Sequence, residues 1–281
     1  MEQIESGVKW DFHVPGYENY WHSGVISSNS GKTTGLAAIG LSWALGEFLW
    51  SGESVFNRLS GKQVKPPIRI FYGAKSFTMA HAEVTMKKLN ELLPFEALGI
   101  MVDRQQGRSA HRIRFPEDLG GSEIKLLSYE QDPEDYEGTT WHLALWDEPP
   151  PRHAYISTAR GCMKHHAPQA FAFTPIKEPW LFDEIYSAKR AIHISSAEET
   201  RKLTKKSFCI VNIHLDDSPY LTQESKEAFI ATLDPEEIES RVRGHWRHLL
   251  GRIYKDFSRE FAPAGHVIAT DDFYLQHKDW K

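Results

Sequence analysis

The chain has 281 residues, a formal net charge of −5 and an ordinary globular composition, with 41% hydrophobic, 12% aromatic and 25% charged residues. Its length predicts one large domain, or one domain with appendages. Its two cysteines, Cys162 and Cys209, exclude a disulfide framework and a four-cysteine zinc site. No apolar stretch reaches the roughly 18 residues of a membrane-spanning helix, and the N-terminus lacks the apolar core of a signal peptide. We therefore expect an intracellular protein that is neither secreted nor bound to a membrane.

Hydrophobic patterning predicts strands that alternate with helices. The predicted elements, in chain order, are a strand at 24–28, a helix at 33–49, a strand at 68–72, a helix at 81–93, strands at 112–115 and 123–128, and strands at 143–146, 170–173 and 208–214. The helix at 33–49 is apolar nearly all round, which is typical of a helix buried against a sheet. The alternation predicts an α/β fold with helices on both faces of a mostly parallel sheet.

A basic, glycine-containing loop joins the first predicted strand to the first predicted helix. Ser30, Gly31, Lys32 and Thr33 match the second half of a phosphate-binding loop, although Ile26 stands where the full pattern has its first glycine. Glycine lets backbone N–H groups approach phosphate oxygens, lysine reaches the β- and γ-phosphates, and the threonine hydroxyl suits Mg²⁺. We therefore predict that ATP is bound by Ser28, Asn29, Ser30, Gly31, Lys32, Thr33 and Thr34. Taken alone, the triplet is equally consistent with a helix start that is merely basic.

Two adjacent carboxylates follow the apolar strand at 143–146. In this position Asp147 can hold the same Mg²⁺ as Thr33, and Glu148 can orient and deprotonate an attacking water. Thr174 ends the next apolar strand, where its hydroxyl can contact the γ-phosphate and couple hydrolysis to movement. Taken alone, the acidic pair is also typical of a solvated turn, and the threonine of an ordinary cap. Together with the basic loop, they predict an ATPase.

In their order and spacing, these motifs resemble the large terminase subunit of tailed bacteriophages. The resemblance covers nearly the whole chain and is carried by ISSNSGKTTGLA at 26–37, LALWDEPP at 143–150, FTP at 173–175, DDSPYL at 216–221 and GRIYKDF at 251–257. It implies an additional-strand P-loop ATPase core at 1–215, a small helical lid subdomain at 216–250 and a linker at 251–281. The family's C-terminal nuclease domain would follow that linker, so we predict no nuclease activity for this chain.

The resemblance also implies an ATPase motor that drives double-stranded DNA into a viral procapsid, with ATP and Mg²⁺ as its cofactors. The implied partners are DNA, the portal protein, the small terminase subunit and further copies of the chain in a ring, usually a pentamer in the family. The implied location is the host cytoplasm, with transient binding at the procapsid portal vertex. Candidate DNA contacts are the basic residues at 104–114 and those at 201–206 together with Lys189 and Arg190, although most charge runs are solvated faces.

The chain departs from the family at three positions used for nucleotide binding or catalysis. Ser28 stands where many members have a loop arginine, and Glu137 where many have the arginine finger of a neighbouring subunit. Tyr17 replaces the glutamine that reads adenine, and we keep it as a candidate nucleotide contact. Phosphoryl transfer benefits from a guanidinium, so we predict Arg160 as the arginine finger, with Arg152 as the second candidate. An ordinary surface arginine is the alternative at both positions.

Two other functions stay open at the level of the sequence. One is a nucleotide-dependent DNA-binding or assembly module with little hydrolysis, which the missing family arginines favour. The other is a helicase-like or repair ATPase, which shares the acidic pair at a strand end but would separate the strands of a duplex.

Overall fold

The computed structural model describes residues 24–27, 32–75, 79–103, 112–131, 137–175, 178–189, 191–194, 208–212, 214–217 and 221–246. These residues belong to one compact unit, Met1–Arg247, and the other unit, His248–Lys281, lies outside the described residues. The linker predicted at 251–281 therefore lies outside them as well. The same holds for the basic stretch at 201–206 and for 104–111 of the other basic stretch.

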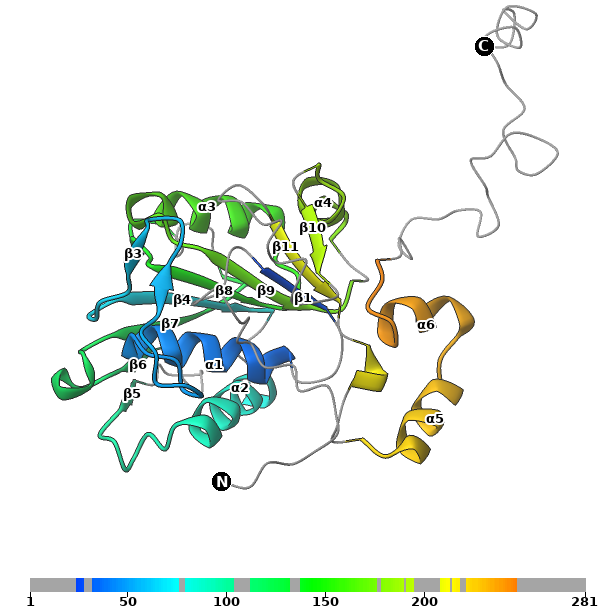
Figure 1. Ribbon diagram of the computed structural model, residues 1–281, viewed down its shortest axis with the longest axis horizontal. Helices are drawn as coiled ribbons and strands as arrows, with labels where there is room; N and C mark the ends of the chain where they lie inside the picture. Colours follow the sequence, from blue (N-terminus) through cyan, green and yellow to red (C-terminus); the bar gives the residue numbers. More distant parts are fainter. Residues whose placement is uncertain are drawn as a thin grey trace, which may run out of the picture. The chain divides into compact units, whose positions relative to one another are not determined.

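A nine-stranded sheet forms the centre of this unit, in the order β10-β11-β1-β9-β8-β4-β7-β6-β5 (Figure 1). In chain order its strands are β1 (Gly24–Ser27), β4 (Arg69–Ala74), β5 (Met101–Asp103), β6 (Arg112–Arg114), β7 (Glu123–Ser128), β8 (Leu143–Asp147), β9 (Gln169–Phe173), β10 (Ala191–Ile194) and β11 (Phe208–Asn212). Neighbouring strands from β10 to β7 are parallel, whereas β6 is antiparallel to β7 and β5. The short strands β2 (Phe56–Asn57) and β3 (Lys62–Gln63) form a separate pair.

The strand order inserts β9 between the strand that precedes the basic loop and the strand that ends in Asp147. On one side β9 pairs with β1, and on the other side it pairs with β8, where Ala172 is opposite Asp147. Parallel strands end at one edge of a sheet, so all three strands deliver the residues that follow them to the same edge. This is the strand order of an additional-strand P-loop fold, which confirms the predicted fold class.

Helices cover both faces of the sheet (Figure 1). The helices α1 (Lys32–Leu45) and α2 (Met79–Leu92) lie together on one face, and α3 (Arg152–Cys162) lies on the other. Most of α1 is buried, as its apolar sequence predicted. It ends at Leu45, before the predicted boundary at residue 49, because Gly46 has a φ of +77° and stops the helix in the left-handed region.

Short helices follow two of the later strands of the sheet. They are α4 (Pro179–Leu181) after β9, and α5 (Gln223–Ala231) and α6 (Pro235–Arg241) after β11. The last two fall in the range 216–250, and their role as a lid stays a prediction. In the part of the chain that the structure describes, no helix has the length and apolar character needed to cross a membrane.

An aromatic cluster fills the core between the sheet and α3. Trp146 of β8 is fully buried, and its ring centroid lies 4.6 Å from that of Phe71 and 5.9 Å from that of Phe171. Its Nε1 donates a hydrogen bond to Gln169 Oε1 at 3.0 Å. Burial and ring packing of this kind hold a strand firmly. Because Asp147 is the next residue, the same packing positions the acidic end of β8.

We expect Trp146→Ala to lower the free energy of unfolding by about 3–5 kcal/mol, because it removes a fully buried indole and leaves a cavity. Chemical denaturation followed by circular dichroism measures this change. The control is Met163→Ala, since the Met163 side chain is 73% exposed. It should change the stability by less than about 0.5 kcal/mol. Equal stabilities of the two variants would contradict the packing of β8 described above.

Candidate active site

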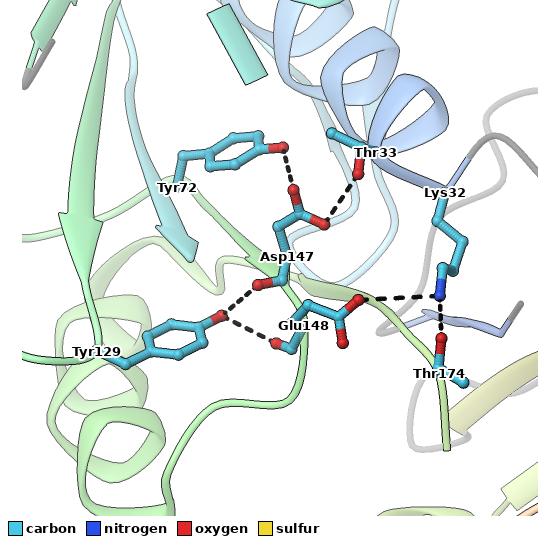
Figure 2. Close-up of polar contacts among 7 residues, drawn as sticks. All are labelled: Lys32, Thr33, Tyr72, Tyr129, Asp147, Glu148 and Thr174. Atoms are coloured by element: carbon cyan, nitrogen blue, oxygen red, sulfur yellow. Dashed lines mark hydrogen bonds and ion pairs between the residues drawn. The ribbon is translucent and has the colours of Figure 1, made fainter. Parts of the chain in front are cut away.

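Five polar side chains from three places in the chain meet at the carboxyl edge of the sheet (Figure 2). Lys32 and Thr33 begin α1, Asp147 ends β8, Glu148 follows it, and Thr174 follows β9. Because β1, β9 and β8 are consecutive in the sheet, the segments that follow them emerge side by side. The fold therefore assembles residues that are far apart in the sequence.

The Lys32 ammonium is held between a hydroxyl and a carboxylate. Its Nζ donates to Thr174 Oγ1 at 2.6 Å and lies 3.9 Å from Glu148 Oε1, and only 9% of the side chain is exposed. Burial lowers the pKa of Lys32 because the ammonium loses hydration, while the negative charges of Glu148 and Asp147 act in the opposite direction. The ammonium is therefore oriented in advance at the start of a helix, where anions are favoured.

Thr33 and Asp147 provide a pair of oxygen atoms suited to Mg²⁺. Thr33 Oγ1 donates to Asp147 Oδ1 at 3.2 Å. Mg²⁺ prefers oxygen ligands, and adjacent ligands of an octahedron with bonds of about 2.1 Å lie about 3 Å apart. The chemistry and spacing of the pair therefore fit two neighbouring positions around this ion. Among the described residues, no group of three or more His, Cys, Asp or Glu could hold a metal.

Asp147 is a buried carboxylate whose charge is only partly compensated. Burial, followed by the negative charge of Glu148, raises its pKa from 3.8 to about 6. Hydrogen bonds from Thr33 and Tyr72 and the charge of Lys32 act in the opposite direction. The Tyr72 hydroxyl donates to Oδ2 at 3.4 Å, and burial raises the pKa of Tyr72, so it stays a donor at neutral pH. A cation beside Asp147 would offset the remaining cost of burying its charge.

A strained turn orients the carboxylate of Glu148. Its φ is +70°, in the left-handed region that side chains occupy at an energetic cost. Its backbone N–H donates to Ala172 O at 2.9 Å, which ties the turn to β9. The Tyr129 hydroxyl lies 3.1 Å from the main-chain oxygens of Gly73 and Asp147 and 3.0 Å from that of Glu148. Tyr129 therefore links the ends of β4, β7 and β8 at the acidic turn (Figure 2).

The predicted site residues that the structure brings together are Lys32, Thr33, Asp147, Glu148 and Thr174. Thr34 lies in the first turn of α1 and is partly buried. The other predicted nucleotide contacts lie outside the described residues, namely Tyr17, Ser28, Asn29, Ser30 and Gly31. The roles assigned to all of these residues toward a ligand stay predictions.

The first predicted finger arginine lies away from this group. Arg160 is 71% exposed, and its Nη1 donates to Glu137 Oε1 at 3.2 Å. The next residue, Gly161, accepts a backbone hydrogen bond from Trp141, which precedes β8. Arg160 therefore lies toward the amino end of β8, at the edge of the sheet opposite Asp147.

The second candidate, Arg152, begins α3 and is 56% exposed, with its Nε 2.6 Å from Glu184 Oε1. Within the described residues neither Arg152 nor Arg160 contacts Lys32 or Glu148. The role of Arg160 as an arginine finger stays a prediction.

Sequence analysis missed the two tyrosines that support the acidic pair. Tyr72 belongs to the apolar strand at 68–72, and Tyr129 directly follows the strand at 123–128. A buried tyrosine needs a partner for its hydroxyl, and this signal could have marked both residues. Their partners were not readable because they depend on β4 lying between β7 and β8 in the sheet.

Comparison with known proteins finds similarity in structure alone. No protein-family model and no curated protein matches the sequence. The large terminase of a thermophilic bacteriophage matches with a TM-score of 0.57 at 15% identity, over 84% of this chain and 50% of that one. The same terminase in complex with ADP gives a TM-score of 0.56 at 16% identity, over 80% of this chain and 48% of that one. A mutant large terminase ATPase domain of Thermus phage P74-26 gives a TM-score of 0.52 at 15% identity, over 84% of this chain and 97% of that domain.

The chain thus has the fold of large terminase ATPase domains, which are additional-strand P-loop folds. It spans about half the length of the first of these terminases and nearly the whole of the isolated ATPase domain. At 15% identity the likeness concerns the fold, so the activity has to be inferred from the site.

Asp147→Asn tests the cost of burying this carboxylate. The unfolded state ionises near the ordinary pKa of 3.8 and the folded state at about 6, so above pH 6 ionisation favours the unfolded state by about 1–3 kcal/mol. Without Mg²⁺, we expect Asp147→Asn to raise the free energy of unfolding at pH 7.5 by this amount. The gain should shrink as the pH falls from 6 toward 4.

Denaturant titrations over this pH range measure the effect. Asp118→Asn is the control, because Asp118 is exposed and should show no comparable gain. A loss of stability in Asp147→Asn at pH 7.5 would contradict the description of Asp147 as a poorly compensated buried charge.

Proposed function

We propose that this chain hydrolyses ATP with Mg²⁺ and uses the energy to move double-stranded DNA into a viral procapsid. The observation that carries the proposal is the meeting of Lys32, Glu148 and Thr174 at the carboxyl edge of the sheet, beside the oxygen pair of Thr33 and Asp147. Phosphate binding, water activation and magnesium binding require these side-chain types at one place. The fold shared with large terminase ATPase domains supports the same choice.

The substrate phosphates would bind at the start of α1. Lys32 supplies the ammonium for the β- and γ-phosphates, and the helix start supplies backbone N–H groups and a positive dipole end. Complexes of a similar terminase with ADP and with ATP-γ-S support an adenine nucleotide as the ligand. Phosphate oxygens would take over from Thr174 and Glu148 as partners of the Lys32 ammonium.

Thr33 and Asp147 would hold Mg²⁺, which when bound neutralises part of the phosphate charge. The Tyr72 hydroxyl donates a hydrogen bond to Oδ2 of Asp147, and the Thr33 hydroxyl donates one to Oδ1. The carboxylate is thereby oriented from both sides. This orientation is what a Mg²⁺ ligand needs, because the ion demands nearly ideal octahedral geometry.

Glu148 would accept the proton of the attacking water. Its side chain is 45% exposed, so water reaches it, and its backbone is fixed by Ala172 and Tyr129. The carboxylate lies 3.9 Å from Lys32 Nζ, on the side of the site where the phosphates would bind. A carboxylate held near both the phosphate ligand and bulk water suits a general base.

Thr174 would couple hydrolysis to movement of the helical lid predicted at 216–250. Its hydroxyl accepts a hydrogen bond from Lys32, so phosphate binding and release would change this contact. The preceding residue, Phe173, packs against Trp246 with ring centroids 5.6 Å apart. Thr174 therefore stands between the phosphate site and the end of that segment, as a coupling residue must.

As a packaging motor, the chain would act as a pentameric ring on the portal protein, in the host cytoplasm, and would receive DNA with the small terminase subunit. Arg160 would then serve as the finger for a neighbouring copy. Its exposure of 71% and its place beside Glu137 on the surface suit contact with another subunit. A guanidinium supplied in this way stabilises the charge of phosphoryl transfer.

We expect Glu148→Gln to reduce ATP turnover by at least about 100-fold, because an amide cannot accept the proton of the water. The amide keeps the shape of the side chain, so nucleotide affinity should change by less than about threefold. Phosphate release and equilibrium nucleotide binding measure these two quantities on the same protein.

Lys32→Ala is the comparison variant and should lose nucleotide binding together with turnover. Duplex DNA should stimulate the wild-type protein most at high protein concentration, where copies can contribute fingers to each other. Full turnover in Glu148→Gln would remove its role as the base. Unchanged nucleotide affinity in Lys32→Ala would remove the ATPase proposal itself.

A further inference from the structure

Arg241 ends α6 with much of its guanidinium available to a ligand. Its Nε donates to Glu237 Oε1 at 2.8 Å, one helical turn earlier, and 37% of the side chain is exposed. Within the described part of the chain this is its one hydrogen bond, so Nη1 and Nη2 can still donate. A guanidinium anchored through Nε keeps a fork of donors that matches phosphate oxygens.

The segment that follows α6 is tied to both neighbours of β1. Val242 O accepts a backbone hydrogen bond from Leu215 N at 2.8 Å, and Leu215 lies after the end of β11. The ring of Trp246 packs against Phe173, the last residue of β9, with centroids 5.6 Å apart. Since β1 lies between β11 and β9, residues 242–246 lie at the carboxyl end of the strand that leads to Lys32. Figure 1 shows α6 on this side of the sheet.

The charge of Arg241 acts on the candidate site. Burial lowers the pKa of Lys32. The negative charges of Glu148 and Asp147 oppose this effect, whereas the positive charge of Arg241 adds to it. The two cations repel each other, which agrees with the place of α6 at the carboxyl edge of the sheet. An anion placed between them would relieve this repulsion.

The charges described at the site favour a second cation beside the phosphates. Lys32 faces two carboxylates, those of Asp147 and Glu148, so this group repels a triphosphate on balance. Magnesium reduces the charge of the nucleotide but leaves it negative. A guanidinium on the side of α6 would make the site favourable to the anion, most strongly toward the phosphate with the greatest charge.

We propose that Arg241 binds the terminal phosphate of ATP in its own subunit, on the side opposite Lys32. This inference rests on the proposed ATPase function and adds a ligand that sequence analysis did not find. It differs from the role predicted for Arg160, which lies at the other edge of the sheet and would act on a neighbouring copy. The contact joins α6 directly to the phosphate that hydrolysis removes, so it is present with ATP and absent with ADP.

The experiment compares Arg241→Ala with Arg243→Ala in the full chain. Arg243 is the matched control because it pairs with Glu239 by the same spacing, two residues further along. Calorimetry measures the affinities for ATP-γ-S and ADP, each with Mg²⁺, at low protein concentration so that neighbouring copies do not contribute. Arg241→Lys serves as a second variant that keeps a charge without the fork.

We expect Arg241→Ala to weaken ATP-γ-S binding about 10- to 100-fold while ADP affinity stays within about twofold. Arg241→Lys should fall between wild type and Arg241→Ala, and Arg243→Ala should bind both nucleotides as the wild type does. Thermal unfolding of each variant verifies that it is folded at the assay temperature. If Arg241→Ala is not folded, Arg241→Lys is compared with the wild type in its place.

The outcomes separate this inference from the proposed function. If Lys32→Ala loses nucleotide binding but Arg241→Ala binds ATP-γ-S like the wild type, the role of Arg241 is overturned and the ATPase proposal stands. An equal loss of ADP and ATP-γ-S in Arg241→Ala overturns the assignment to the terminal phosphate. If Lys32→Ala binds nucleotide normally, the proposed function fails, and this inference fails with it.

Discussion

The candidate site depends on one constraint, which is that three consecutive parallel strands end at the same edge of the sheet. Through this constraint the start of α1, the acidic end of β8 and the residue after β9 become neighbours. With β9 between the other two strands, Thr33 and Asp147 lie within hydrogen-bond distance at 3.2 Å. A shift of β8 by one residue would turn the Asp147 side chain to the other face of the sheet. The packing of Trp146 in the core therefore also sets the geometry of the site.

The site holds groups that are unfavourable for stability and useful for binding charged ligands. Lys32 and Asp147 are charged side chains with little access to water, and Glu148 has a left-handed backbone. Neighbouring groups limit the cost: Tyr72 donates to the carboxylate of Asp147, and the Tyr129 hydroxyl lies against the main-chain oxygens of the turn. Desolvated charges with specific partners are common at functional sites, because phosphates and metal ions compensate them on binding.

The arginines show that proximity in the sequence is a poor guide to proximity at this site. α3 begins beside the acidic turn but runs back along β8, so Arg160 in its last turn reaches the opposite edge. Arg241 is far from Lys32 in the sequence, yet α6, which it ends, lies beside the end of the strand that leads to that lysine. The reason is tertiary: a backbone hydrogen bond to Leu215 and the contact of Trp246 with Phe173 hold the end of α6 at the carboxyl edge.

By itself the sequence determined the α/β class, the buried α1 and the residues at three strand ends, because hydrophobic period and residue type are local properties. The sequence placed the end of α1 too late, at residue 49. The helix stops at Leu45, because the next residue, Gly46, takes a left-handed conformation. Only the tertiary structure decided that Tyr72 and Tyr129 support the acidic pair and that the helix ending in Arg241 lies at the carboxyl edge, whereas Arg160 lies at the opposite edge. Hydrogen bonds and charge interactions act over a few ångströms between elements that are neighbours in space, and the order of strands in the sheet decides which elements those are.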